Sequence, residues 1–194
     1  MSAAAAEVFA AAPVGELTFS CASSDLDIAR AAAFRRRVFM DRRGVSFDEA
    51  LEARRDRLGH VFVLAEAGAP VATARVLRHP SPLSPLATLV LAPALAARGA
   101  DSEVGRIAAI ACPQAIQFSL VLLTLGSIWL TRNTGLSRYV AYCHPRLLDL
   151  YRAVGAEDTG LCVAVPGRDE PHRIICGAYA DAARLGGQRL GVEP

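Results

Sequence analysis

The sequence contains no lysine, so all 21 of its basic side chains are arginines. Because arginine stands wherever a positive charge is needed, its mere presence says little about an anion-binding site, and its position must carry the argument. The formal net charge is only +2. Such a balance gives no electrostatic reason to expect nucleic acid as a partner, and we expect none.

Paired cysteines are missing as well. The five cysteines are odd in number, and no two of them form a C-x-x-C pair. This pattern argues against a disulfide framework and against a zinc site, and it is typical of a protein in the reducing cytosol. We therefore expect no metal and a cytoplasmic location.

The sequence offers no clear leader peptide or membrane span. Its alanine-rich start carries Glu7 and no basic leader, so residues 1–16 are expected to form a flexible N-terminus. Residues 115–130 are uncharged but short for a membrane span, and they are better explained as a helix buried in a core. The length of 194 residues predicts a single domain, at residues 17–190.

The hydrophobic pattern predicts a mixed sheet with helices packed on it. The expected strands are residues 17–22, 61–65, 71–77, 103–110, 138–143, 161–165 and 172–178. The expected helices are one from about residue 25 to 43, a short one starting at 46–49, one at 86–98, a long one from 113 and one at 146–154.

The strand at residues 103–110 opens with two charges, in Glu103-Val104-Gly105-Arg106. Burying either charge costs several kcal/mol unless it is paired or put to use. Residues three apart in a regular strand point to opposite faces, so Glu103 and Arg106 should not share a side. A bulge permitted by Gly105 would shift the alternation and bring both side chains to one cleft. We therefore regard this strand as a candidate site.

Four short motifs, in this order, resemble those of the GNAT acyltransferase superfamily. Within it, the chain looks most like the acyl-homoserine lactone synthases (autoinducer synthases) and the N-acyl amino acid synthases. The motifs are Arg35-Arg36-Arg37-Val38-Phe39 with the following Asp41-Arg42-Arg43-Gly44, Asp56 before the first hairpin strand, Arg75 within the second, and Glu103-Val104-Gly105-Arg106.

The resemblance implies a GNAT-like α/β (mixed α+β) fold. Its central sheet is mixed and mostly antiparallel, with a bulged central strand and helices on both faces. It also implies an acyltransferase in which a small amine attacks a fatty acyl thioester directly. No tightly bound cofactor is then expected, and acyl carrier protein (ACP) or coenzyme A carries the acyl group as co-substrate.

The resemblance also assigns roles to particular residues. The catalytic candidates are Glu103, as the base that takes the ammonium proton, and Tyr151, as the acid for the leaving thiolate. The substrate-binding candidates are Arg35, Phe39, Asp56, Arg75 and Arg106. Two plainer interpretations stay open: Glu103 as an ion-pair partner of Arg106 or Arg75, and Tyr151 as a packed helix residue. Cys143-His144, beside Pro145, is expected to be structural, because direct attack needs no covalent intermediate.

Two departures from the motifs bear on the acceptor. Val45 stands where the lactone synthases usually have tryptophan, and the first of their two acidic positions falls on Ala53, with only Glu52 beside it. Aromatic and acidic groups would hold the sulfonium cation of S-adenosylmethionine. Their loss favours an amino acid or similar small amine as the acceptor.

A third departure bears on the acyl donor. Coenzyme A-dependent relatives bind the pyrophosphate on a glycine-rich turn at a helix N-terminus. The corresponding turn here, residues 111–117, has neither glycine nor arginine, and Pro113 removes one N–H donor. This favours an acyl carrier protein as donor and partner.

The sequence therefore predicts an N-acyltransferase that joins a fatty acyl group from ACP to an amino acid or similar amine. Three alternatives stay open. They are a lactone synthase using S-adenosylmethionine, an acetyl- or acyl-coenzyme A-dependent N-acetyltransferase, and a non-catalytic acyl-binding or sensor domain.

Overall fold

The computed structural model describes residues 16–42, 44–46, 48–89, 98–166 and 168–192. The N-terminus expected to be flexible, residues 1–16, lies outside these ranges except for its last residue. Most of the helix expected at 86–98 lies outside them too. The assignment of residues 17–190 to one domain stays a prediction.

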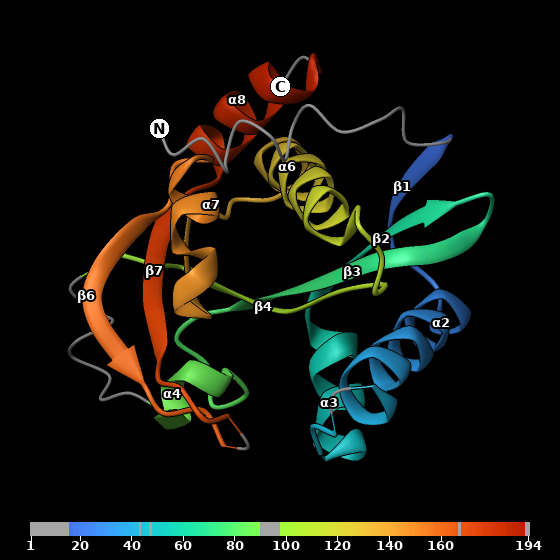
Figure 1. The fold of residues 1–194 in the computed structure, drawn as a ribbon, viewed down its shortest axis with the longest axis horizontal. Helices are drawn as coiled ribbons and strands as arrows, with labels where there is room; N and C mark the ends of the chain where they lie inside the picture. The colour runs from blue at the N-terminus through green and yellow to red at the C-terminus, as the bar shows by residue number, and fades with distance from the viewer. Residues whose placement is uncertain (1–15, 43, 47, 90–97, 167, 193–194) are drawn as a thin grey trace.

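Seven strands form one sheet in the order β1-β2-β3-β4-β5-β7-β6 (Figure 1). They are β1 (Leu17–Cys21), β2 (His60–Glu66), β3 (Ala69–Arg78), β4 (Ser102–Ala109), β5 (Arg138–Cys143), β6 (Glu157–Val163) and β7 (His172–Ala178). Every neighbouring pair is antiparallel except β4 and β5. The predicted mixed, mostly antiparallel sheet is confirmed.

The parallel pair β4–β5 is held together at one end only. Its register joins Ser102 to Tyr139 and Glu103 to Val140, and pairing stops there. Beyond these residues the two strands diverge, so the sheet opens at its centre. Cavities on the two faces of the sheet can meet through such an opening.

The predicted bulge in β4 is confirmed, but it falls one residue after Gly105. Arg75 of β3 lies opposite Gly105, whereas Thr73 lies opposite Ala108. Two residues of β4, Arg106 and Ile107, therefore face a single residue of β3. Arg106 adopts a left-handed φ of 53°, which costs a non-glycine residue roughly 1–2 kcal/mol. Gly105 keeps the regular strand conformation, and the left-handed residue of the bulge is Arg106.

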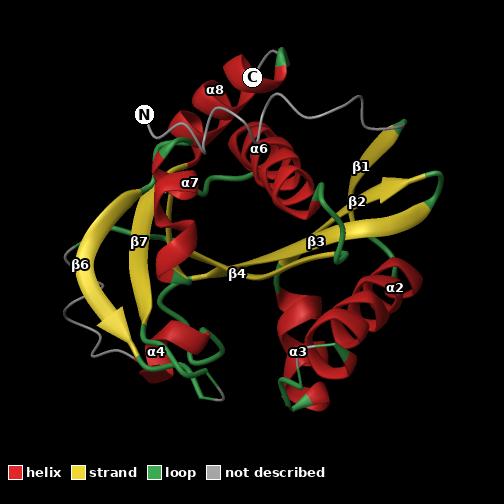
Figure 2. Cartoon of the chain, in the orientation of Figure 1, coloured by secondary structure: helices red, strands yellow, loops and turns green. Residues whose placement is uncertain are grey.

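Helices cover both faces of the sheet, as predicted (Figure 2). On one face lie α2 (Asp25–Arg36), the π-helical turn η1 (Arg37–Asp41) and α3 (Glu49–Leu58); on the other lie α6 (Ala115–Asn133) and α8 (Tyr179–Leu190). Shorter pieces are α4 (Pro85–Leu89), the 3-10 turn η2 (Pro145–Leu147) and α7 (Leu148–Arg152). Side-chain caps mark the starts of α2 and α3. The Ser24 hydroxyl accepts a hydrogen bond from the Asp27 N–H before α2, and the Asp48 carboxylate accepts one from the Leu51 N–H before α3.

Helix α8 was not expected from the sequence. Its Gly186-Gly187 pair lowers helix propensity, but it allows close packing against α6. A Cβ atom on Gly186 would lie 2.2 Å from Oγ1 of Thr124. By length and composition alone, α6 is apolar enough to cross a membrane. In this fold it packs on the sheet, with Phe118 and Leu122 buried in the main hydrophobic core.

Candidate functional site

A buried cluster of arginines and carboxylates lies between α3 and the central strands. Glu52 is its centre and accepts hydrogen bonds from three arginines: Arg55 at 2.6 Å, Arg75 at 2.8 Å, and Arg106 through Nε and Nη2, both at 2.9 Å. The bidentate bond from Arg106 holds the bulged residue in place. Burial opposes the ionisation of Glu52, but Arg106 and Arg75 outweigh it and hold the pKa of Glu52 well below its usual range.

Asp56 extends the cluster toward α2. It lies four residues after Glu52, so both carboxylates project from the same side of α3. Arg35 pairs with Oδ2 of Asp56, and Arg75 reaches Oδ1 at 3.1 Å. Arg35 and Asp56, both predicted to bind substrate, are thus bound to each other.

The cluster carries more positive than negative charge. Four arginines (Arg35, Arg55, Arg75 and Arg106) surround two carboxylates (Glu52 and Asp56), which leaves a formal charge of +2. Arg106, whose side chain is 20% exposed, is the member that most faces the adjoining cavity. This edge of the cluster therefore favours the binding of an anionic group.

Sequence reasoning missed Glu52. The spacing of the family motif placed the first acidic position on Ala53, next to it. A side chain on a helix neighbours the residues three and four positions away. An acid at position 52 therefore lies next to Asp56 just as an acid at position 53 would. The missing signal was the helical periodicity of α3, which puts Glu52 and Asp56 on one stripe.

Glu103 occupies a different environment a short way along β4. Its Oε2 atom accepts a hydrogen bond from the hydroxyl of Ser84 and another, at 3.1 Å, from the N–H of Leu86. Burial raises the pKa of the Glu103 carboxyl, even though these bonds and the charges of Arg75 and Arg55 favour its ionised form. Its Oε1 atom lies 3.9 Å from the point where a Cβ on Gly105 would stand, so a side chain at position 105 would contact that oxygen.

A cavity of about 400 Å³, lined by both charged and apolar side chains, adjoins the cluster and is called the polar cavity below. Gly105 and Arg106 form one side of it, and Phe39 of η1 lies beneath Arg106, with the guanidinium carbon 5.8 Å from the ring centroid. His144 and His172 line the opposite side, at the ends of β5 and β7. The cavity thus lies on the face of the sheet that α2 and α3 cover.

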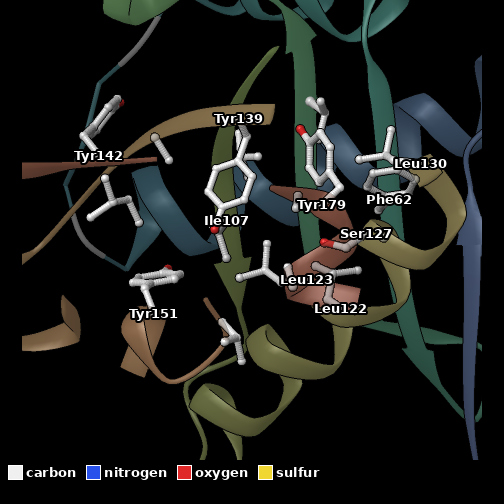
Figure 3. Close-up of a pocket in the computed structure, with 18 residues that line it drawn as sticks. Phe62, Ile107, Leu122, Leu123, Ser127, Leu130, Tyr139, Tyr142, Tyr151 and Tyr179 are labelled. Atoms are coloured by element: carbon white, nitrogen blue, oxygen red, sulfur yellow. The ribbon is translucent and has the colours of Figure 1, made fainter. Parts of the chain in front are cut away.

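An apolar cavity of about 40 Å³ lies on the other face, beneath α6 (Figure 3). Leu122, Leu123 and Leu130 of α6 line it together with Phe62. All four tyrosines of the chain also line it: Tyr139, Tyr142, Tyr151 and Tyr179. In this state it has room for only a few water-sized groups, so a fatty chain would need the surrounding side chains to move apart.

The two cavities share four lining residues: Val104, Ile107, Tyr142 and Tyr151. These belong to β4, β5 and α7, so the junction lies where β4 and β5 diverge. Tyr151 therefore stands between an arginine-lined space and an apolar one. Burial raises the pKa of its hydroxyl well above the usual value, which keeps it protonated at neutral pH.

The structure brings most of the predicted site residues together. Arg35, Asp56, Arg75 and Arg106 form the cluster around Glu52, and Phe39 lies at its edge. Glu103 lies beside the cluster, and its two hydrogen bonds come from Ser84 and Leu86, whereas the bidentate partner of Arg106 is Glu52. Cys143 lines the polar cavity, but burial raises the pKa of its thiol to about 11, so it is a poor nucleophile at neutral pH.

Solved structures share this fold. FeeM, an N-acyl amino acid synthase from uncultured soil microbes, aligns with a TM-score of 0.71 and 14% identity over 85% of this chain and 91% of its own. The acyl-homoserine lactone synthase LasI aligns with a TM-score of 0.67 and 14% identity over 93% and 98%. A putative N-acetyltransferase from Lactobacillus plantarum aligns at 0.60 and 21% over 85% and 99%.

No protein-family model matches the sequence, and no curated protein matches it significantly. At these identities the structural similarity establishes the fold. The GNAT-like fold, and the likeness to autoinducer and N-acyl amino acid synthases that the motifs predicted, are confirmed at that level.

Proposed function

We propose that this chain is an N-acyltransferase that moves a fatty acyl group from an ACP thioester to the amine of an amino acid. One observation carries the proposal. A cavity lined by an arginine and an apolar cavity meet at the gap between β4 and β5, with Tyr151 at the junction and Glu103 on the adjoining strand. Such a junction suits a reaction that joins a polar acceptor to an apolar chain.

The charge of the cluster supports an anionic acceptor. Glu52 and Asp56 are already neutralised by arginines, and the excess charge is positive. Arg106 presents its guanidinium to the polar cavity, where the carboxylate of an amino acid would find a partner. The ring of Phe39 beneath it adds an apolar surface for the acceptor side chain.

The turn before α6 supports ACP as the donor. Pro113 has no N–H, and the N–H of Ala115 is already bonded to the carbonyl of Cys112 at 3.1 Å. Neither position then offers a backbone donor to the pyrophosphate of coenzyme A. A donor held through its pantetheine arm and by a carrier-protein surface needs none of them.

The proposed mechanism is direct attack of the amine on the thioester carbon. Glu103, directly or through solvent near Gly105, takes a proton from the ammonium group, and its raised pKa suits that task. The bulge takes the backbone N–H of Ile107 out of the regular ladder, and we propose it as a donor to the oxyanion. Tyr151, protonated at neutral pH, donates to the leaving thiolate.

The test is a matrix of donors and acceptors followed by mass spectrometry. Purified chain is incubated with octanoyl-ACP, octanoyl-coenzyme A or acetyl-coenzyme A as donor and the twenty amino acids as acceptors. We expect an N-octanoyl amino acid from the ACP donor and little from coenzyme A. Efficient transfer from acetyl-coenzyme A at micromolar concentration would contradict the donor assignment. Octanoyl-ACP binding without any transfer to the tested amines would favour an acyl-binding domain.

Lactone synthesis remains a second candidate because of Glu52. The acid that the sequence motif lacked at Ala53 is supplied next to it, and Glu52 and Asp56 both reach Arg75. TofI, one of the proteins with this fold, has been crystallised with an inhibitor and MTA, at a TM-score of 0.62 and 19% identity. Adding S-adenosylmethionine to the same reactions separates the two: lactone formation requires its consumption, whereas N-acylation of an amino acid does not.

A further inference from the structure

A chain of three polar side chains runs from Glu103 away from the acceptor cavity. The Ser84 hydroxyl donates to Oε2 of Glu103, and Nδ1 of His79 lies 3.1 Å from the Ser84 oxygen. Ser84 is completely buried, whereas His79 is 9% exposed. The chain therefore leads from a buried carboxylate to a side chain that solvent reaches.

The loop after β3 is fastened in a way that fixes this chain of contacts. The N–H of His79 donates to the carbonyl of Asp101 at 2.8 Å, and Nε of Arg55 donates to the carbonyl of Leu83 at 2.7 Å. The Ala87 N–H also donates to the Ser84 oxygen at 3.3 Å. Both ends of the loop are thus held against the sheet and α3, and Ser84 has little freedom to turn away from Glu103.

We propose that Ser84 and His79 are the route by which the proton taken up by Glu103 leaves the site. This inference rests on the proposed function, in which Glu103 is the base. The order of the three groups also excludes a Ser-His-Glu nucleophile: the serine lies between the other two, is fully buried, and faces the carboxylate directly. Ser84 and His79 act on the reaction through Glu103 and are positioning residues.

The transfer balances in protons. The acceptor ammonium gives one proton to Glu103, and its nitrogen lone pair forms the new bond to the thioester carbon. Glu103 holds this proton on Oε2. The Ser84 hydroxyl turns to Nδ1 of His79, gives it its own proton and takes the Oε2 proton of Glu103. His79 then loses its Nε2 proton to solvent, and it returns to its starting tautomer when the Nδ1 proton is exchanged with water for one at Nε2. Tyr151 gives its hydroxyl proton to the leaving thiolate and takes the second proton of the attacking nitrogen in its place. The products are amide, thiol and one proton in solution, and Ser84 is left donating to Glu103, as in the structure.

The charged groups around Glu103 are compatible with this direction of transfer. Arg75 of β3 and Arg55 of α3 act on it through their charges, and Tyr142 of β5 is close enough to interact as well. Both arginines favour return of Glu103 to its ionised form after each turnover. Burial lowers the pKa of His79, so it holds a proton only briefly.

His79→Asn is the sharpest variant, because asparagine can keep the hydrogen bond to Ser84 but cannot carry a proton. With octanoyl-ACP and the acceptor identified as above, we expect kcat to fall about 10²-fold with KM little changed. Added imidazole should restore much of the rate in proportion to its concentration. His60→Asn is the matched control: this half-buried histidine packs on Trp129, with ring centroids 5.3 Å apart, and its replacement should leave kcat unchanged.

Ser84→Ala tests whether Ser84 carries the proton or only holds its loop in place. It breaks the link between Glu103 and His79, so kcat should fall and imidazole should not restore it. A normal kcat in His79→Asn, or a loss that imidazole leaves untouched in a variant with wild-type thermal stability, overturns the relay. If Glu103→Gln is inactive while His79→Asn is normal, only the relay fails. If Glu103→Gln is fully active, the proposed base itself is wrong.

Discussion

Two buried glutamates close to the bulge of β4 have opposite surroundings. Glu52 is 6% exposed and is bound by three arginines, whereas Glu103 is 2% exposed and is bound by a hydroxyl and a backbone N–H. The pKa of the first is held far below its usual range, and burial raises the pKa of the second. Equal burial therefore produces a permanent anion in one place and a proton acceptor in the other.

The difference follows from the positions of the arginines. Arg106 turns toward Glu52 because the bulge puts it on that face, and Arg75 bridges Glu52 and Asp56. Glu103 receives neutral donors from the loop after β3. A carboxyl without a direct cationic partner, whose pKa burial raises, accepts a proton more readily than an ordinary glutamate, which is what a general base requires.

The largest expected effect is that of Glu103→Gln on turnover. Loss of a general base lowers kcat about 10²–10⁴-fold. Because burial raises the pKa of Glu103, its contribution to stability is present at low pH and is lost as pH rises through the folded-state pKa. At neutral pH the glutamine variant should therefore be at least as stable as the wild type. Urea denaturation and kcat, measured on the same preparation, check both points; a destabilised variant with normal turnover would reverse the roles of the two glutamates.

Glu52→Gln should do the opposite and act mainly on stability. Removing one partner of a buried ion pair costs about 3–5 kcal/mol. Here Arg55, Arg75 and Arg106 lose the carboxylate that they share, although Arg75 keeps its contact with Asp56. The pKa of Glu52 is lowered by folding, so its contribution is present above the unfolded-state value of about 4.3 and is lost on acidification.

Glu49→Gln on the same helix is the control for Glu52→Gln. Glu49 forms an exposed pair with Arg36, and its loss should change stability by less than about 0.5 kcal/mol. Equal effects of the two substitutions in denaturation curves at pH 7 would show that the cluster around Glu52 does not stabilise the fold.

Tyr151→Phe tests the acid at the junction of the cavities. We expect kcat to fall about 10²-fold with an alkyl thioester donor, since the thiolate leaves unprotonated. A thiophenyl ester, whose thiolate is a much better leaving group, should recover most of this loss. The same defect with both donors would identify Tyr151 as a packing residue.

Ile107→Phe tests whether the apolar cavity holds the acyl chain. The larger side chain would narrow the junction between the two cavities. We expect the kcat/KM for octanoyl transfer, relative to acetyl transfer, to fall at least about 10–200-fold, the range for a mismatch of one methylene in a hydrophobic pocket. An unchanged ratio would place the chain elsewhere.

Much of the fold could be predicted from the sequence because its signals are local. Ser24 and Asp48 mark helix starts, and Glu103 to Arg106 marked a strand that needed a bulge. Helix α8 escaped prediction because Gly186 makes sense only against Thr124, a contact between residues far apart in the chain. Local propensity cannot report such a contact.

The candidate site was predicted in part for the same reason. Arg35, Asp56 and Arg75 were found from motifs. The centre of their cluster, Glu52, was missed because the motif spacing pointed to the next residue, Ala53. Ser84 carried no signal at all, since a serine in a proline-rich loop is ordinary until the fold sets it against Glu103. The junction at Tyr151 depends on how far β4 and β5 diverge, and no residue pattern encodes that.

The central claim is that Glu103 is the base, and the pH dependence of single-turnover acyl transfer tests it most directly. In the wild type we expect the rate to rise with pH through a pKa above the value of about 4.3 for an unperturbed glutamate. In Glu103→Gln that rise should disappear and the rate should be low throughout. Superimposable profiles for the two proteins would contradict the account.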